Sequence, residues 1–252
     1  GTALSAAFLW LAFRNVPRGE VAAALRDADY RFVALGLGLV LVSPLLRAAR
    51  WRVLFRPHEQ GLGYLRLSEV LLIGQMLNIV VPARIGELAR IYLIGELTDR
   101  SRARTLGTIA VEKWSDLVML LLLVLFAPFF MTLPAWFRDA RLTLGGLIGA
   151  FFVVALVLTQ YQDRLVGLVP RVARVLPQQW RDRLAQAVGQ AVDGLAVLRS
   201  LDTSLRLQGW SVLILLDSVL TNYVIFRAVG LPLSVAAAVF LLAVLQVGVA
   251  VL

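Results

Sequence analysis

Cysteine is absent from this 252-residue chain, and histidine occurs only once. The missing thiols exclude disulfides, cysteine nucleophiles and cysteine-based metal sites, and a single histidine lacks the partners that a metal site needs. Charged residues are also scarce, at 16% of the chain, whereas hydrophobic residues make up 60%. We therefore expect a membrane protein that holds no metal and no other cofactor.

Lysine is nearly missing as well, because the 25 basic residues are 24 arginines and the single Lys113, for a formal net charge of +9. The arginines stand mostly between hydrophobic runs, where basic residues set membrane topology and contact anionic lipid headgroups. We expect no nucleic-acid partner. The motifs of a P-loop, a serine-hydrolase elbow and a zinc-protease helix are also missing, so the chain is not expected to be an enzyme.

Five hydrophobic runs are each long enough, or nearly so, for the roughly 20 residues that cross a bilayer as a helix. They are Phe32–Leu46, Thr105–Met131, Leu142–Thr159, Leu205–Arg227 and Leu233–Leu252. We expect the first of these spans to end near Leu46, with Arg50 and Trp51 at the headgroup boundary. The sequence thus predicts an all-α fold, a polytopic transmembrane helical bundle that forms a single domain over residues 1–252. We expect this domain to be truncated at both ends, because the apolar start is only half a span and the chain stops inside an apolar run.

Residues 67–96 depart from this pattern. The apolar run Leu67–Val81 ends at Pro82, and the apolar run that follows is interrupted by charged residues. Neither half makes a full crossing, so we expect a re-entrant helix hairpin over about 67–96 that is broken at Pro82 and Gly86.

Residues 161–204 are basic, with apolar residues at helical spacing, and predict amphipathic surface helices. Arginines are more numerous here and in the loops 47–66 and 97–104 than in the loops of the opposite side. By the positive-inside rule these three segments are cytoplasmic, which places the mouth of the hairpin on the cytoplasmic side.

Ionisable residues are concentrated where the chain should lie at membrane depth. Arg84 and Arg90 are costly there unless they are paired, so we expect carboxylate partners. Glu87 lies in the same segment, and Glu112 and Asp116 share one face of the next span because they are four residues apart. One interpretation is a polar cavity in which arginines bind the phosphate of a lipid headgroup. The other is a neutral ion-pair network that only locks the hairpin to its neighbour.

Three motifs in order carry a resemblance: Arg47-Ala-Ala-Arg50-Trp51, then Asn78-x-x-x-Pro82-x-Arg84-x-Gly86-Glu87-x-x-Arg90, then Glu112-Lys113-x-x-Asp116. Together they resemble the transmembrane domain of the lysylphosphatidylglycerol synthase family, also described as flippase-like membrane proteins. The resemblance implies a multi-pass protein of a prokaryotic inner (cytoplasmic) membrane that moves lipids between leaflets. Two departures limit it: the family's second proline- and glycine-rich motif does not occur before Leu252, and no acyltransferase-like domain is present, so synthase activity is not expected.

We therefore expect a flippase for an anionic phospholipid, such as aminoacylated phosphatidylglycerol, or for a polyprenyl-phosphate-linked lipid. The expected substrate-binding residues are Arg84, Arg90, Glu87, Asn78, Glu112, Lys113, Asp116, Arg47 and Arg50, with Asp217 as a further residue that lines the same cavity. A lipid-modifying enzyme, a lipid-binding regulator or scaffold, and a small-solute transporter remain alternatives, and assembly into a homo-oligomer stays open.

Overall fold

The computed structural model describes residues 17–55, 63–80, 85–97, 102–130 and 200–251, with a few isolated positions between 143 and 178. These ranges form helices, and no strand occurs within them. The helices are α2 (Arg18–Arg26), α3 (Tyr30–Phe55), α4 (Tyr64–Val80), α5 (Gly86–Leu97), α6 (Arg102–Phe130), α10 (Leu201–Ala228) and α11 (Val235–Val251). The predicted all-α class is therefore confirmed for the described part of the chain.

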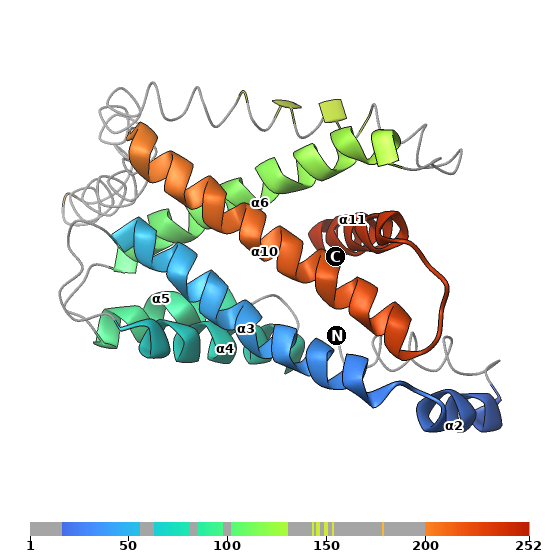
Figure 1. The fold of residues 1–252 in the computed structure, drawn as a ribbon. Coiled ribbons are helices and arrows are strands. Elements are labelled where there is room, and N and C mark those ends of the chain that lie inside the picture. Colours follow the sequence, from blue (N-terminus) through green and yellow to red (C-terminus); the bar gives the residue numbers. More distant parts are fainter. Residues whose placement is uncertain are drawn as a thin grey trace.

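The two long helices α3 and α10 run side by side (Figure 1). The pair α4 and α5 packs together at the C-terminal half of α3, and α6 contacts α3, α5, α10 and α11. Segments that are far apart in the sequence thus meet around α6, which makes this helix the centre of the arrangement.

Helix α3 differs in one respect from the sequence expectation. We expected the span to end near Leu46, with Arg50 and Trp51 at the headgroup boundary, but the helix continues to Phe55. The side chains of Arg50 and Trp51 are both about 1% exposed. This expectation was wrong because the C-terminal half of α3 packs against α4 and α6, which provide partners for a buried guanidinium and a buried indole.

The main core lies under this C-terminal half of α3. Its buried members come from α3, α4, α5, α6 and α10 and include Trp51, Phe55, Leu67, Ile94 and Leu207. A second, smaller cluster joins α6 to α11 through Leu123, Leu242 and Ala243. The two clusters fix α6 at both of its ends, which positions the polar side chains between them.

The N-terminal half of α3 has the opposite character. Leu35, Leu37 and Leu41 are 50%, 61% and 74% exposed, respectively. Among the described residues, α3 and α10 are the two helices that are long and apolar enough to cross a membrane. An apolar surface on such helices suits contact with lipid chains, where exposed leucine has no hydration cost.

Several sequence expectations fall outside the described residues. These are the partial span before residue 14, most of the span 142–159, the surface helices of 161–204, and the two hairpin residues Pro82 and Arg84. They stay predictions.

The helices α4 and α5 approach each other closely at two glycines. A Cβ atom added to Gly86 would collide with the carbonyl oxygen of Gly74 and would lie 2.5 Å from Oδ1 of Asn78. The Asn78 oxygen also accepts a hydrogen bond of 2.7 Å from the backbone N–H of Gly86 and so satisfies a donor in the first turn of α5. Gly86 is therefore required here for the close packing of the two helices.

We predict that Gly86→Ala lowers the free energy of unfolding by about 1–3 kcal/mol, the usual cost of overpacking. The measurement is chemical unfolding of the purified protein in detergent micelles. The control is Gly38→Ala on α3, where an added Cβ meets no atom within 4 Å. Because alanine favours a helix by up to about 1 kcal/mol over glycine, Gly38→Ala should be neutral or stabilising. Equal losses in both variants would contradict the close packing.

Candidate functional site

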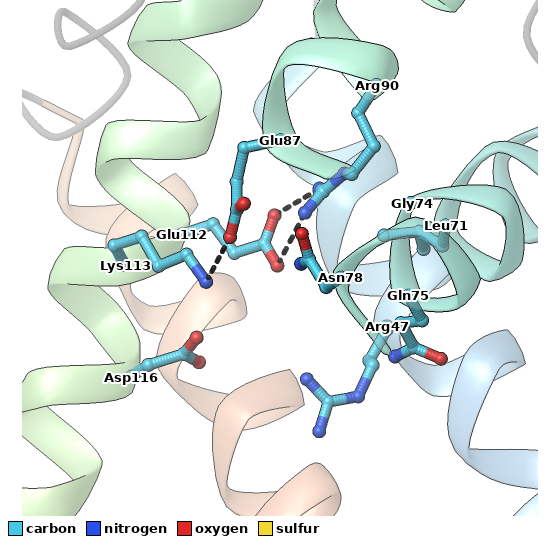
Figure 2. Close-up of a pocket in the computed structure, with 10 residues that line it drawn as sticks. All are labelled: Arg47, Leu71, Gly74, Gln75, Asn78, Glu87, Arg90, Glu112, Lys113 and Asp116. Carbon is cyan, nitrogen blue, oxygen red and sulfur yellow. Dashed lines mark hydrogen bonds and ion pairs between the residues drawn. The ribbon is translucent and has the colours of Figure 1, made fainter. Parts of the chain in front are cut away.

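Glu112 on α6 is buried and holds two arginines from other helices. Its Oε2 lies 2.5 Å from Nη2 of Arg90 on α5, and its Oε1 lies 3.5 Å from Nη1 of the same guanidinium (Figure 2). The same Oε1 lies 3.4 Å from Nη2 of Arg50 on α3. One carboxylate thus connects α3, α5 and α6, in the paired arrangement that a buried arginine needs.

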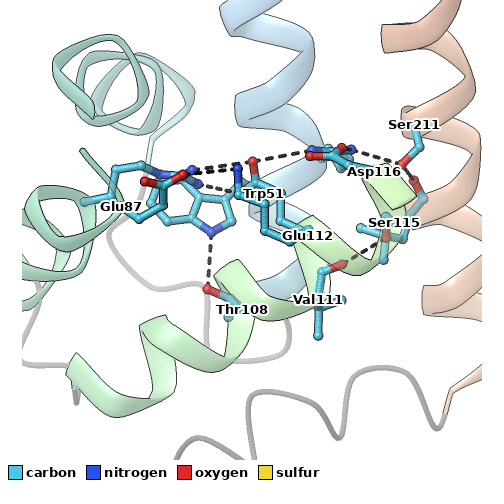
Figure 3. A network of polar contacts seen from close by, with 12 residues as sticks. Trp51, Glu87, Thr108, Val111, Glu112, Ser115, Asp116 and Ser211 are labelled. Carbon is cyan, nitrogen blue, oxygen red and sulfur yellow. Dashed lines mark hydrogen bonds and ion pairs between the residues drawn. The ribbon is translucent and has the colours of Figure 1, made fainter. Parts of the chain in front are cut away.

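Arg50 extends this network to a fourth helix. Its Nη1 lies 2.6 Å from Oδ1 of Asp116 on α6 and donates to Oγ of Ser211 on α10 at 3.2 Å. Figure 3 shows Glu112, Asp116 and Ser211 along one line of polar contacts between the helices. The predicted pairing of Arg90 with a carboxylate is therefore observed, with Glu112 as its partner, whereas the pairing of Arg50 with Glu112 and Asp116 was not predicted.

The indole of Trp51 packs against the network through its contact with Arg90. The guanidinium carbon of Arg90 lies 4.2 Å from the ring centroid, a cation–π contact, and the indole N–H donates to Oγ1 of Thr108 at 3.2 Å. Gly74 on α4 leaves room for the aliphatic part of Arg90, since an added Cβ there would lie 2.8 Å from its Cγ and Cδ. The position of the Arg90 guanidinium is thus fixed on several sides.

A further ion pair lies on the more exposed side of the cluster. Nζ of Lys113 lies 3.2 Å from Oε1 of Glu87, which joins α6 to the first turn of α5 (Figure 2). The lysine side chain is 52% exposed, so this pair is far weaker than the buried ones. When it opens, Lys113 can reach solvent, whereas the Glu87 side chain, which is 22% exposed, stays largely buried.

A polar cavity of about 80 Å³ lies between α3, α4, α5 and α6. Its lining residues are Arg47, Leu71, Gly74, Gln75, Asn78, Glu87, Arg90, Glu112, Lys113 and Asp116 (Figure 2). A cavity of this size holds a few water molecules or a small polar group such as a phosphate.

The ion-pair cluster around this cavity has one more cation than carboxylates. The cluster contains four cations and three carboxylates: Arg47, Arg50, Arg90 and Lys113 against Glu87, Glu112 and Asp116. Every member except Arg47 takes part in an ion pair. Arg47 has no carboxylate within ion-pair distance in the described part of the chain, and its guanidinium points into the space near Gln75 and Asp116 (Figure 2). The residues that line the cavity include three cations and three carboxylates, and Arg47 is the one of these cations that has no carboxylate at ion-pair distance among the described residues.

The structure brings most of the predicted site residues together, with three differences. Arg50 lies behind the cavity wall in ion pairs and does not line the cavity. Arg84 lies outside the described residues. Asp217 lines a different, larger cavity of about 310 Å³ between α3, α4, α10 and α11, so the expectation that it faces the same cavity was wrong.

Sequence reasoning missed two polar residues. Gln75 lines both cavities, and Ser211 binds Arg50. A signal for Gln75 was present, because it is a polar residue inside the otherwise apolar run Leu67–Val81. Ser211 carried no such signal, since a serine in a membrane helix commonly bonds to the backbone of its own helix.

Comparison with known proteins agrees with these motifs. The whole chain, residues 1–252, matches the family described as the lysylphosphatidylglycerol synthase TM region. It is 26% identical over 243 residues to a UPF0104 membrane protein of Methanothermobacter thermautotrophicus, which covers 90% of this chain and 72% of the relative.

A shorter match reaches the glycosyltransferase AglD of Haloferax volcanii, at 31% identity over 120 residues. It covers 47% of this chain and only 19% of that protein. No solved structure matches the chain.

We predict that Glu112→Gln destabilises the fold by about 3–5 kcal/mol, because it leaves Arg90 and Arg50 buried without their shared carboxylate. Unfolding in detergent micelles measures the change. The control is Glu96→Gln, which removes an exposed pair with Arg102 and should cost about 1 kcal/mol or less. If Glu112→Gln were as mild as its control, Glu112 would not be the anchor of the buried network.

Proposed function

Because this chain belongs to the lysylphosphatidylglycerol synthase TM region family, we propose that it is a lipid flippase that binds the phosphate of an anionic lipid in the polar cavity at Arg47. The headgroup would cross between α3, α4, α5 and α6 while its chains stay in the bilayer. Two classes of lipid fit this description: aminoacylated phosphatidylglycerol and polyprenyl-phosphate-linked lipids.

The observation that carries the proposal is the unpaired guanidinium of Arg47. A cation at membrane depth is costly unless an anion neutralises it. Arg90 and Lys113 also line the cavity, and each keeps N–H groups beyond those used in its ion pair. A phosphate would accept hydrogen bonds from Arg47 and from these neighbours, and a planar guanidinium fits it in a two-bond arrangement.

The short helices beside the cavity support a path for the headgroup. At about 1.5 Å per residue, the 12 residues of α5 reach only about 18 Å, which is less than the roughly 30 Å of a hydrocarbon core. A helix of this length, packed against α4, agrees with a re-entrant hairpin whose broken end lies inside the membrane. Transporters commonly form their binding sites where helices break at such depth.

The ion pairs argue against a lipid-modifying enzyme built on the carboxylates of this cavity. General acid–base catalysis needs a group that exchanges protons with the substrate. Glu112 instead contacts two guanidiniums, and Glu87 and Asp116 each contact one cation. These contacts occupy the carboxylates with cations, which suits a role in orienting the cations.

The role expected for Arg84 remains part of the proposal. It precedes Gly86 by two residues, and Asn78 already fixes the backbone of Gly86 at the start of α5. We expect its guanidinium to act as a second phosphate ligand.

We predict that Arg47→Gln slows lipid translocation about tenfold or more, because a hydrogen bond to a charged group contributes about 1.5–3 kcal/mol. The measurement is reconstitution into liposomes with a tail-labelled fluorescent anionic lipid, followed by quenching of the outer leaflet over time. Arg84→Ala is expected to act in the same direction.

The matched control is Arg206→Gln on α10, which removes an exposed arginine paired with Asp202 and should leave the rate unchanged. Equal rates for wild type and Arg47→Gln would contradict the assigned site. A wild type that moves no lipid beyond empty vesicles, yet binds lipid in an Arg47-dependent way, would favour the binding or regulatory function instead.

A further inference from the structure

The larger cavity contains a buried carboxylate that the polar cavity does not use. Asp217 lies near the middle of α10, is 8% exposed, and lines the space of about 310 Å³ between α3, α4, α10 and α11. Ser43 of α3 lines the same cavity. In the described part of the chain Asp217 makes no ion pair, and Arg47 acts on it electrostatically from beyond ion-pair distance.

Two hydroxyl groups beside Asp217 present hydrogen-bond acceptors to this cavity. The hydroxyl of Ser218 donates to the carbonyl of Ile214 at 2.9 Å, and the hydroxyl of Thr221 donates to the carbonyl of Asp217 at 2.8 Å. Since each hydroxyl has one hydrogen, both present only lone pairs to the cavity.

The proline in α3 adds a further acceptor. Pro44 and Val40 both line the cavity. Pro44 has no backbone N–H, so the carbonyl of Val40 receives no helical hydrogen bond from it. In a membrane such a freed carbonyl needs a donor from elsewhere.

The two cavities therefore have opposite character and adjoin each other. The polar cavity presents Arg47, which has no carboxylate at ion-pair distance among the described residues, whereas the larger cavity presents Asp217, which has no cation at that distance. Gln75 on α4 lines both cavities. One bound molecule can thus contact both when it carries an anion and a cation a few bonds apart.

Resting on the proposed function, we propose that the Asp217 cavity binds the primary ammonium group of a phospholipid headgroup whose phosphate lies at Arg47. The ammonium would donate to the carboxylate of Asp217, to the hydroxyl oxygens of Ser218 and Thr221, and to the carbonyl of Val40. The amide N–H of Asn222, which is buried without a hydrogen-bond partner among the described residues, would donate to an ester or phosphate oxygen of the same headgroup. Asp217 then selects lipids that carry an amine.

The test compares two lipids with the same chains, phosphatidylethanolamine and phosphatidylglycerol, which differ in the amine. Their binding to the purified full-length protein in detergent is measured by native mass spectrometry, and their translocation in liposomes is measured with tail-labelled forms. Wild type should prefer phosphatidylethanolamine. Asp217→Asn keeps the shape and should reduce binding of this lipid about tenfold, while binding of phosphatidylglycerol changes less than about twofold.

Retained binding of phosphatidylglycerol shows that Asp217→Asn is folded. Should that variant not fold, Ser218→Ala serves in its place and should lower the same preference in the same direction. The matched control is Asp202→Asn at the exposed start of α10, which should leave both lipids unaffected.

The outcomes separate the two proposals. Translocation of both lipids with no preference, or equal effects of Asp217→Asn on both, would overturn the ammonium site and leave the flippase standing. If Asp217→Asn selectively lost phosphatidylethanolamine binding while the wild type translocated no lipid, the ammonium site would stand and the flippase would be overturned. Free ethanolamine that displaces the lipid at equal concentration would assign the site to a soluble ammonium compound and overturn its role in the lipid headgroup.

Discussion

The contact on which this structure depends is the one between Glu112 and the guanidiniums of Arg90 and Arg50. Three helices supply these charges, and all three side chains are buried. A buried ion pair is not in itself a large source of stability, because desolvation offsets much of the attraction. Its consequence is geometric: each helix must keep its rotation and depth, since moving any one would leave a charge without its partner.

That constraint makes the neighbouring cavities possible. Arg50, Arg90 and Lys113 are each held by a carboxylate, whereas Arg47 and, on the other side of Gln75, Asp217 have no partner at ion-pair distance among the described residues. The paired charges stabilise the helix arrangement, and the charges without an ion-pair partner are the ones that we propose bind a ligand. The two interpretations of the charged segment, architectural network and headgroup site, therefore apply to different members of one cluster.

Much of the helical fold and of the ion pairing was predictable, because a membrane permits few backbone structures and few unpaired charges. Long apolar runs become helices, and ionisable groups at depth require partners. The helices α4 and α5 follow the apolar run up to Val80 and the charged run after Gly86. The pairing of Arg90 with Glu112 follows from the shortage of carboxylates nearby. The termination of α3 near Leu46 was wrong because arginine and tryptophan are as compatible with a polar protein interior as with a headgroup boundary.

The sequence by itself determined the helical class, the family motifs and the set of charges that must be balanced. The tertiary structure alone decided which charges are balanced. Arg47 and Arg50 are three residues apart, about 60° around the same helix, yet Arg50 faces Asp116 and Ser211 while Arg47 faces an open cavity. Asp217 likewise belongs to a separate cavity because α10 packs along α3 with that face toward α11. Such assignments depend on helix rotation and crossing, which side-chain packing sets and a single sequence does not encode in any local pattern.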